Sequence, residues 1–188
     1  LAALIDTAGR LVAHGATILV MACNTAHVWH PALAGRFPCY FPSLITATAA
    51  ALKREGRGST VGLMATDGLI HTGLYQDELA RTGLTCILPA PDRQRVLMEA
   101  VYGPEGIKLG GEASRGGARV REVSDHLRGR GCGVVIAGCT ELPLAVPDLI
   151  AAGTVIDPMA VTAAAIREWI DRQGGRRGLF GSGRSLRQ

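Results

Sequence analysis

Two cysteines in this chain each end an apolar run and are followed at once by polar residues. Cys23 ends the run in LVMACNTAHVWHP, and Cys139 ends a similar run in VVIAGCTELPL. Where such a junction begins a helix, unpaired backbone N–H groups stabilise a nearby anion, either a carboxylate or a thiolate. Free cysteine is often only a small buried side chain. Two junctions of the same kind favour a functional pair of thiols.

The residues behind each cysteine can bind an anionic substrate. Asn24 and Thr25 follow the first thiol, and Thr140 and Glu141 follow the second. We expect the backbone N–H groups and hydroxyls in the stretch of Asn24, Thr25 and Thr140 to hold a substrate carboxylate as negative charge spreads onto it.

Four kinds of chemistry could use these thiols. A disulfide needs Cα atoms within about 7 Å and an oxidising compartment. Zinc needs a fuller set of Cys and His ligands than His27 and these thiols supply, so we expect no metal. A Cys–His nucleophile could pair His27 with Cys23, but Cys139 would then have no role. Inversion of a carbon centre without a cofactor uses both thiols, because one removes a proton and the other returns one to the opposite face.

Composition sets the broad class. The chain has 188 residues, of which 47% are apolar and 4% aromatic, and its five cysteines show no disulfide spacing. We therefore expect a cytoplasmic protein with reduced thiols. No apolar run is long enough to predict a membrane span. Residues 174–188 hold four arginines and no acid, which accounts for the net charge of +4, so we expect a disordered basic tail and no nucleic-acid partner.

Strand-like and helical segments alternate along the chain, which predicts an α/β fold with parallel sheets. Buried strands are expected at 16–22, 60–66, 85–91, 132–138 and 153–158, and helices at 1–14, 45–56, 68–83, 93–103, 113–131 and 159–175. Ligands of such folds bind beyond the carboxyl ends of the strands. Both cysteines occupy that position.

The two cysteine motifs also look like a diverged internal repeat, which predicts two pseudosymmetric lobes with the active site in the cleft between them. The first lobe is expected to comprise residues 1–43 and 150–173, and the second residues 44–149.

At these motifs the sequence resembles the aspartate/glutamate racemase family, and within it the pyridoxal-independent aspartate racemases. MACNTAH and GCTELPL carry the resemblance most specifically, and VGLMATDGLIHTGLYQDELARTG, MEAVYGPEGIKLGG and VIDPMAVTAAAIREWI extend it. It covers residues 1–172. It implies a racemase without a cofactor that acts on a small amino acid, usually as a homodimer.

The resemblance also implies a role for particular residues. Cys23 and Cys139 are the expected acid/base pair. Thr25 and Thr140 are expected near the substrate α-carboxylate, and Lys108 of the IKLGG segment is expected to pair with the side-chain carboxylate.

Two further residues, His27 and Glu141, are expected to orient the neighbouring thiols, although either could equally cap local structure.

Departures from the family pattern leave other functions open. Family members open with a strand and a Gly-rich loop that do not precede Leu1, so we expect the first lobe to be incomplete in this chain. Leu69 stands where the family has a hydroxyl residue. A diacid isomerase, a hydantoin racemase and an inactive ligand-binding remnant remain alternatives. An arylmalonate-type decarboxylase is disfavoured, because it needs only one thiol.

Overall fold

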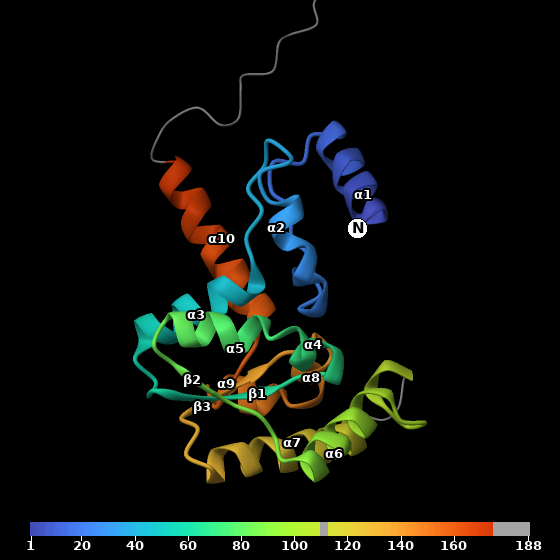
Figure 1. Cartoon of the computed structure of the whole chain (residues 1–188), viewed down its shortest axis with the longest axis vertical. Helices are drawn as coiled ribbons and strands as arrows, with labels where there is room; N and C mark the ends of the chain where they lie inside the picture. The colour runs from blue at the N-terminus through green and yellow to red at the C-terminus, as the bar shows by residue number, and fades with distance from the viewer. Residues whose placement is uncertain (110–112, 175–188) are drawn as a thin grey trace, which may run out of the picture.

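The computed structural model of the chain describes residues 1–109 and 113–174, so nearly all of the expected basic tail lies outside the described residues. Its centre is a four-stranded parallel sheet with the order β2-β1-β3-β4 (Figure 1). The strands are β1 (Thr60–Met64), β2 (Thr85–Ile87), β3 (Val134–Ala137) and β4 (Val155–Ile156). Each lies within a predicted strand, so the α/β class with a parallel sheet is confirmed.

Helices cover both faces of this sheet. One layer contains α3 (Leu44–Glu55), α4 (Asp67–Thr72) and α5 (Leu74–Arg81), and the other contains α6 (Pro91–Tyr102) and α7 (Ala113–Gly129) (Figure 1). Side chains of β3 alternate between the two cores: Val134 and Ile136 pack with the first layer, and Val135 and Ala137 with the second. The strand is buried on both faces, which explains why it is continuously apolar.

The remaining elements lie outside the two helix layers, and one of them adds Leu142 and Ala145 to the core on the α7 side. They are α1 (Ala2–Ala13), η1 (Thr25–Trp29), α2 (His30–Leu33), η2 (Ile107–Leu109), α8 (Leu142–Ala145), α9 (Pro147–Ala151) and α10 (Pro158–Gly174). Helix α10 packs on α3, and its Trp169 stacks on Tyr40 with ring centroids 4.5 Å apart. No helix of the described ranges is both long and apolar enough to cross a membrane.

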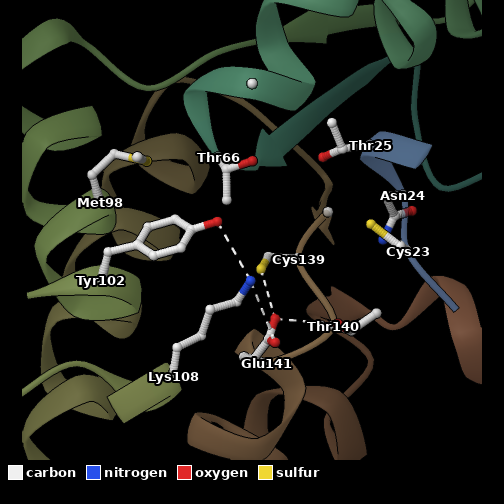
Figure 2. A pocket seen from close by; sticks show the side chains of 12 residues that line it. Cys23, Asn24, Thr25, Thr66, Met98, Tyr102, Lys108, Cys139, Thr140 and Glu141 are labelled. Carbon is white, nitrogen blue, oxygen red and sulfur yellow. Dashed lines mark hydrogen bonds and ion pairs between the residues drawn. The ribbon is translucent and has the colours of Figure 1, made fainter. Parts of the chain in front are cut away.

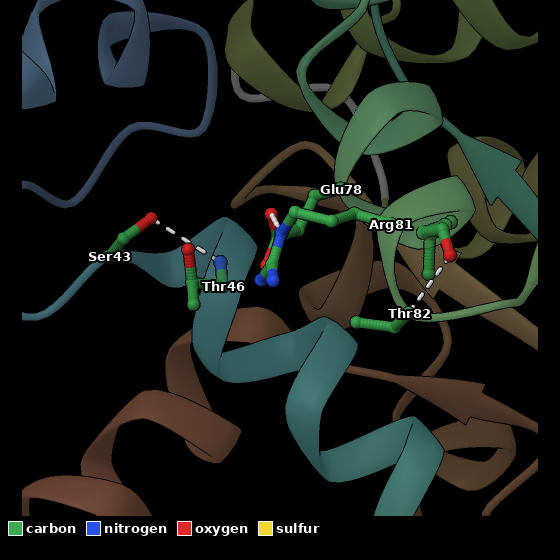
Figure 3. Close-up of polar contacts among 6 residues, drawn as sticks. Ser43, Thr46, Glu78, Arg81 and Thr82 are labelled. Carbon is green, nitrogen blue, oxygen red and sulfur yellow. Dashed lines mark hydrogen bonds and ion pairs between the residues drawn. The ribbon is translucent and has the colours of Figure 1, made fainter.

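The predicted helix 68–83 is two helices. Gly73 has φ of +70°, a left-handed conformation that glycine adopts without strain, and it separates α4 from α5. Local side chains then fix the helix ends on this face (Figure 3). The Ser43 hydroxyl accepts from the Thr46 N–H at the start of α3, and the Thr82 hydroxyl donates to the Leu79 carbonyl at the end of α5.

The strand predicted at 16–22 was wrong. Its backbone makes one parallel bridge, between Ile18 and Tyr40, with the Leu19 N–H donating to the Tyr40 carbonyl and the Tyr40 N–H donating to the Thr17 carbonyl. A strand needs a hydrogen-bonded neighbour along its length, and within the described residues this segment forms a bridge only with the short stretch at Tyr40. It still delivers Cys23 to the edge of the fold.

Candidate active site

A cavity of about 390 Å³ opens at the carboxyl ends of β1 and β3, and both cysteines line it (Figure 2). Gly138 and the residues after β3 form one side, while the turn into η1 forms another. The structure brings all but one of the predicted site residues to this cavity: Cys23, Asn24, Thr25, Lys108, Cys139, Thr140 and Glu141. In the part of the chain that the structure describes, no group of three or more His, Cys, Asp or Glu side chains could hold a metal ion.

The Cys139 thiol faces a carboxylate. Its Sγ donates to Oε2 of Glu141 across 2.8 Å, and the residue is only 8% exposed. Burial, followed by the hydrogen bond to Glu141, raises the pKa of the Cys139 thiol to about 11. Burial alone would raise the pKa of Glu141, but the hydrogen bond from Cys139 and the charge of Lys108 outweigh it and lower that pKa. Near neutral pH the pair is therefore a thiol next to a carboxylate.

Lys108, on η2, completes this cluster. Its Nζ lies 3.6 Å from Oε1 of Glu141, donates to the Tyr102 hydroxyl across 3.4 Å, and sits 4.8 Å from the centre of the Tyr102 ring. Burial disfavours the ammonium, but the Tyr102 hydroxyl and the nearby Cys139 and Glu141 raise the pKa of Lys108 overall. The cavity thus contains a positive charge that a substrate anion can share (Figure 2).

His27 lies next to the Cys23 carbonyl and does not line this cavity. The Leu44 N–H donates to its Nε2 across 3.0 Å, so the ring proton is on Nδ1, which lies 2.8 Å from the Cys23 carbonyl. Burial lowers the pKa of His27, which is consistent with a neutral ring. Because backbone groups use both nitrogens, His27 supports the turn at Cys23 and is not placed to act as a base for its thiol.

Asn24 is held by a residue that sequence reasoning missed. Its side chain is 3% exposed, and Oδ1 accepts from the hydroxyl of Tyr75 across 2.8 Å. Among the described residues, its Nδ2 has no hydrogen-bond partner. Tyr75 belongs to α5 and is fully buried. In the sequence it is one apolar position of an amphipathic helix, so nothing local indicated a role at the site.

Other cavity residues also went unrecognised. Thr66 follows β1 at the same sheet edge as Cys139, so the rule that located the cysteine could have located it. Met98 and Tyr102 lie four residues apart on α6 and share one helix face toward the cavity (Figure 2). Their spacing is that of ordinary core residues, and only the packing of α6 against the sheet distinguishes them.

Comparison with known proteins identifies the family of this chain. The family model described as Asp/Glu/Hydantoin racemase matches residues 1–166. The chain belongs to this family. A glutamate racemase of Pseudomonas paraeruginosa is 33% identical over 189 residues, covering 93% of this chain and 64% of the relative. The chain spans 60 to 65% of the length of the curated relatives that it matches.

Solved racemase structures share the fold. An aspartate racemase of Picrophilus torridus superposes with a TM-score of 0.72 at 24% identity, covering 88% of this chain and 68% of that one. An aspartate racemase homologue from Pyrococcus horikoshii gives the same TM-score at 25% identity, with coverage of 88% and 72%. The family predicted from the two cysteine motifs is confirmed, and the two-lobe arrangement is consistent with these structures.

Proposed function

We propose that the chain carries the catalytic centre of a cofactor-independent racemase that interconverts L- and D-aspartate, or L- and D-glutamate. Cys23 and Cys139 serve as its two acid/base groups. One observation carries this proposal: two thiols that are 116 positions apart in the sequence line one cavity, and one of them donates a hydrogen bond to a carboxylate. Two groups of this kind can act on opposite faces of one carbon.

Two proton transfers invert the centre. In one direction the Cys23 thiolate takes the proton from Cα, so that the Cα–H bond breaks and an S–H bond forms. The Cys139 thiol gives its proton to the opposite face of the resulting carbanion and becomes a thiolate. The reverse direction exchanges the two roles. Each turnover leaves the protons arranged for the other enantiomer, and exchange with water restores the starting arrangement.

Two sets of donors orient the substrate in this proposal. Asn24, Thr25 and Thr140 hold the α-carboxylate, which accepts charge as the proton leaves. Lys108 pairs with the side-chain carboxylate. The ammonium within the cavity favours an acidic amino acid over a neutral hydantoin ring. We also propose that the protein acts in the cytoplasm as a homodimer. Light scattering of the purified protein tests whether it is a dimer.

Chiral analysis in heavy water tests the proposal. We expect the protein to convert L-aspartate or L-glutamate to the D-enantiomer with deuterium at Cα, with no effect of added pyridoxal phosphate. Cys23→Ala and Cys139→Ala should each abolish conversion. Cys39→Ala is the matched control, because Cys39 is a free thiol that does not line the cavity, and it should retain the parental rate.

Three results would count against the proposal. Unchanged racemisation by the double cysteine variant would exclude the two-thiol mechanism. Turnover of a hydantoin or of an unsaturated diacid, with neither amino acid converted, would assign the chain to another branch of the family. Binding of aspartate without any turnover would favour the inactive remnant.

A further inference from the structure

The side-chain amide of Asn24 has one satisfied end and one unsatisfied end. Tyr75 donates to Oδ1, whereas Nδ2 is buried and has no partner among the described residues. A buried donor without an acceptor is costly, so it needs an explanation. Asn24 lines the cavity, and Figure 2 shows its amide nitrogen next to Cys23. The unsatisfied N–H groups therefore lie at the cavity that is proposed to bind the substrate.

We propose that Tyr75 is a positioning residue that holds the Asn24 amide with Nδ2 toward the cavity, as a preset donor for a substrate carboxylate. This inference rests on the proposed function and extends it. It explains why one amide end is tied to a buried phenol that touches no part of the cavity. It also specifies the ligand group: an oxygen that accepts hydrogen bonds.

The surroundings of Tyr75 make this orientation rigid. The ring is fully buried in the core formed by α3, α4, α5 and the sheet, so the hydroxyl cannot move far. Burial raises the pKa of Tyr75, which keeps the hydroxyl protonated and able to donate. Thr48 of α3 lies beside the same hydroxyl and donates its own proton to the Leu44 carbonyl across 2.7 Å. The phenol is thus fixed from the α3 side as well.

Orientation of the amide decides which ligands fit. With Nδ2 toward the cavity, a carboxylate oxygen completes the hydrogen bonds of Asn24. With the amide rotated by half a turn, Oδ1 would face the same carboxylate and repel it. In the structure the Tyr75 hydroxyl donates to Oδ1 across 2.8 Å, which is the first arrangement.

Equilibrium binding in a catalytically silent background tests this inference separately from racemisation. Calorimetric titration of the Cys139→Ala protein with L-aspartate, and with succinate as a second probe, gives the dissociation constants. Tyr75→Phe keeps the buried ring and removes only the hydroxyl. We expect it to weaken aspartate binding about tenfold, which corresponds to one misplaced hydrogen bond to a charged group. Tyr40→Phe is the matched control and should bind as the parent does, since Tyr40 stacks on α10 outside the cavity.

A double-mutant cycle separates positioning from a structural effect. If Tyr75 acts through Asn24, Tyr75→Phe should cost nothing further in an Asn24→Ala protein. Additive losses, or an unchanged dissociation constant for folded Tyr75→Phe, would overturn the inference.

A variant that leaves Tyr75 intact keeps the test decisive if Tyr75→Phe does not fold. Asn24→Asp retains the acceptor for Tyr75 and replaces the Nδ2 donor by a carboxylate oxygen, so it should weaken aspartate binding more than Asn24→Ala does. Equal or tighter binding by Asn24→Asp would contradict the assigned amide orientation. If these binding results hold and no racemisation occurs, the proposed function fails while the role of Tyr75 stands.

Discussion

Replacing Glu141 by Gln should make the Cys139 thiol easier to ionise. The carboxylate accepts the thiol hydrogen bond across 2.8 Å, which favours the protonated sulfur, and its charge opposes a thiolate. Glu141→Gln removes that charge and supplies an amide that can donate to a thiolate. Lys108 also loses an anionic partner 3.6 Å away, so its charge acts more fully on the sulfur. Each change lowers the pKa of Cys139.

The expected size follows from the strength of that hydrogen bond. A hydrogen bond to a charged group contributes about 1.5–3 kcal/mol, or roughly one to two pKa units. Burial is the largest cause of the raised pKa, and the substitution leaves it unchanged. We therefore expect the pKa of the Cys139 thiol to fall from about 11 toward its ordinary range without passing below that range. The lower pKa increases the fraction of Cys139 present as thiolate, whereas a less basic thiolate is a weaker nucleophile. At a fixed pH near 8 the two effects together should raise the alkylation rate by about 4- to 13-fold.

Alkylation measured residue by residue provides the assay. In a Cys23→Ala background, iodoacetamide labelling of Cys139 is followed by peptide mass spectrometry over a range of pH. Glu122→Gln is the control: it removes an equal charge from α7, where Glu122 pairs with Arg93 on the surface. The view that the carboxylate holds the thiol protonated would be refuted if Cys139 were labelled no faster in Glu141→Gln than in the Cys23→Ala parent and in the Glu122→Gln control.

Three further predictions concern Lys108, His27 and Cys86. Lys108→Met should raise KM for aspartate about tenfold or more in steady-state kinetics, with Lys108→Arg retaining part of the affinity, because the substrate loses a charge-assisted partner. His27→Ala should lower the free energy of unfolding in urea by about 2–4 kcal/mol, because it leaves the buried Leu44 N–H and the part-buried Cys23 carbonyl unpaired. His14→Ala removes the same kind of contact from an exposed site and should change the free energy of unfolding by less than about 0.5 kcal/mol. Burial raises the pKa of Cys86 to about 11, so the thiol of the unfolded chain ionises at a lower pH than that of the folded chain, and the free energy of unfolding should fall as pH rises from about 9 to 11. Urea unfolding at pH 7.5 and 10.5 should show a smaller fall for Cys86→Ala than for the parent.

Much of the site could be predicted because its residues follow strands. The carboxyl ends of β1 and β3 meet at one sheet edge, and a thiol placed directly after β3 must appear there. The motif around Cys23 was informative for a different reason. Its polar residues follow an apolar segment that was wrongly predicted as a strand, yet the segment still ends at the cavity.

The amino-acid sequence by itself determined the family, the α/β class and the positions of the two thiols, since apolar periodicity and short motifs are local properties of the chain. Tertiary structure alone decided which groups meet those residues. Tyr75 reaches Asn24 from 51 positions away, and one Glu141 carboxylate faces both Lys108 and Cys139. Such contacts depend on how helices pack across the sheet, where sequence separation carries no information about the distance between side chains.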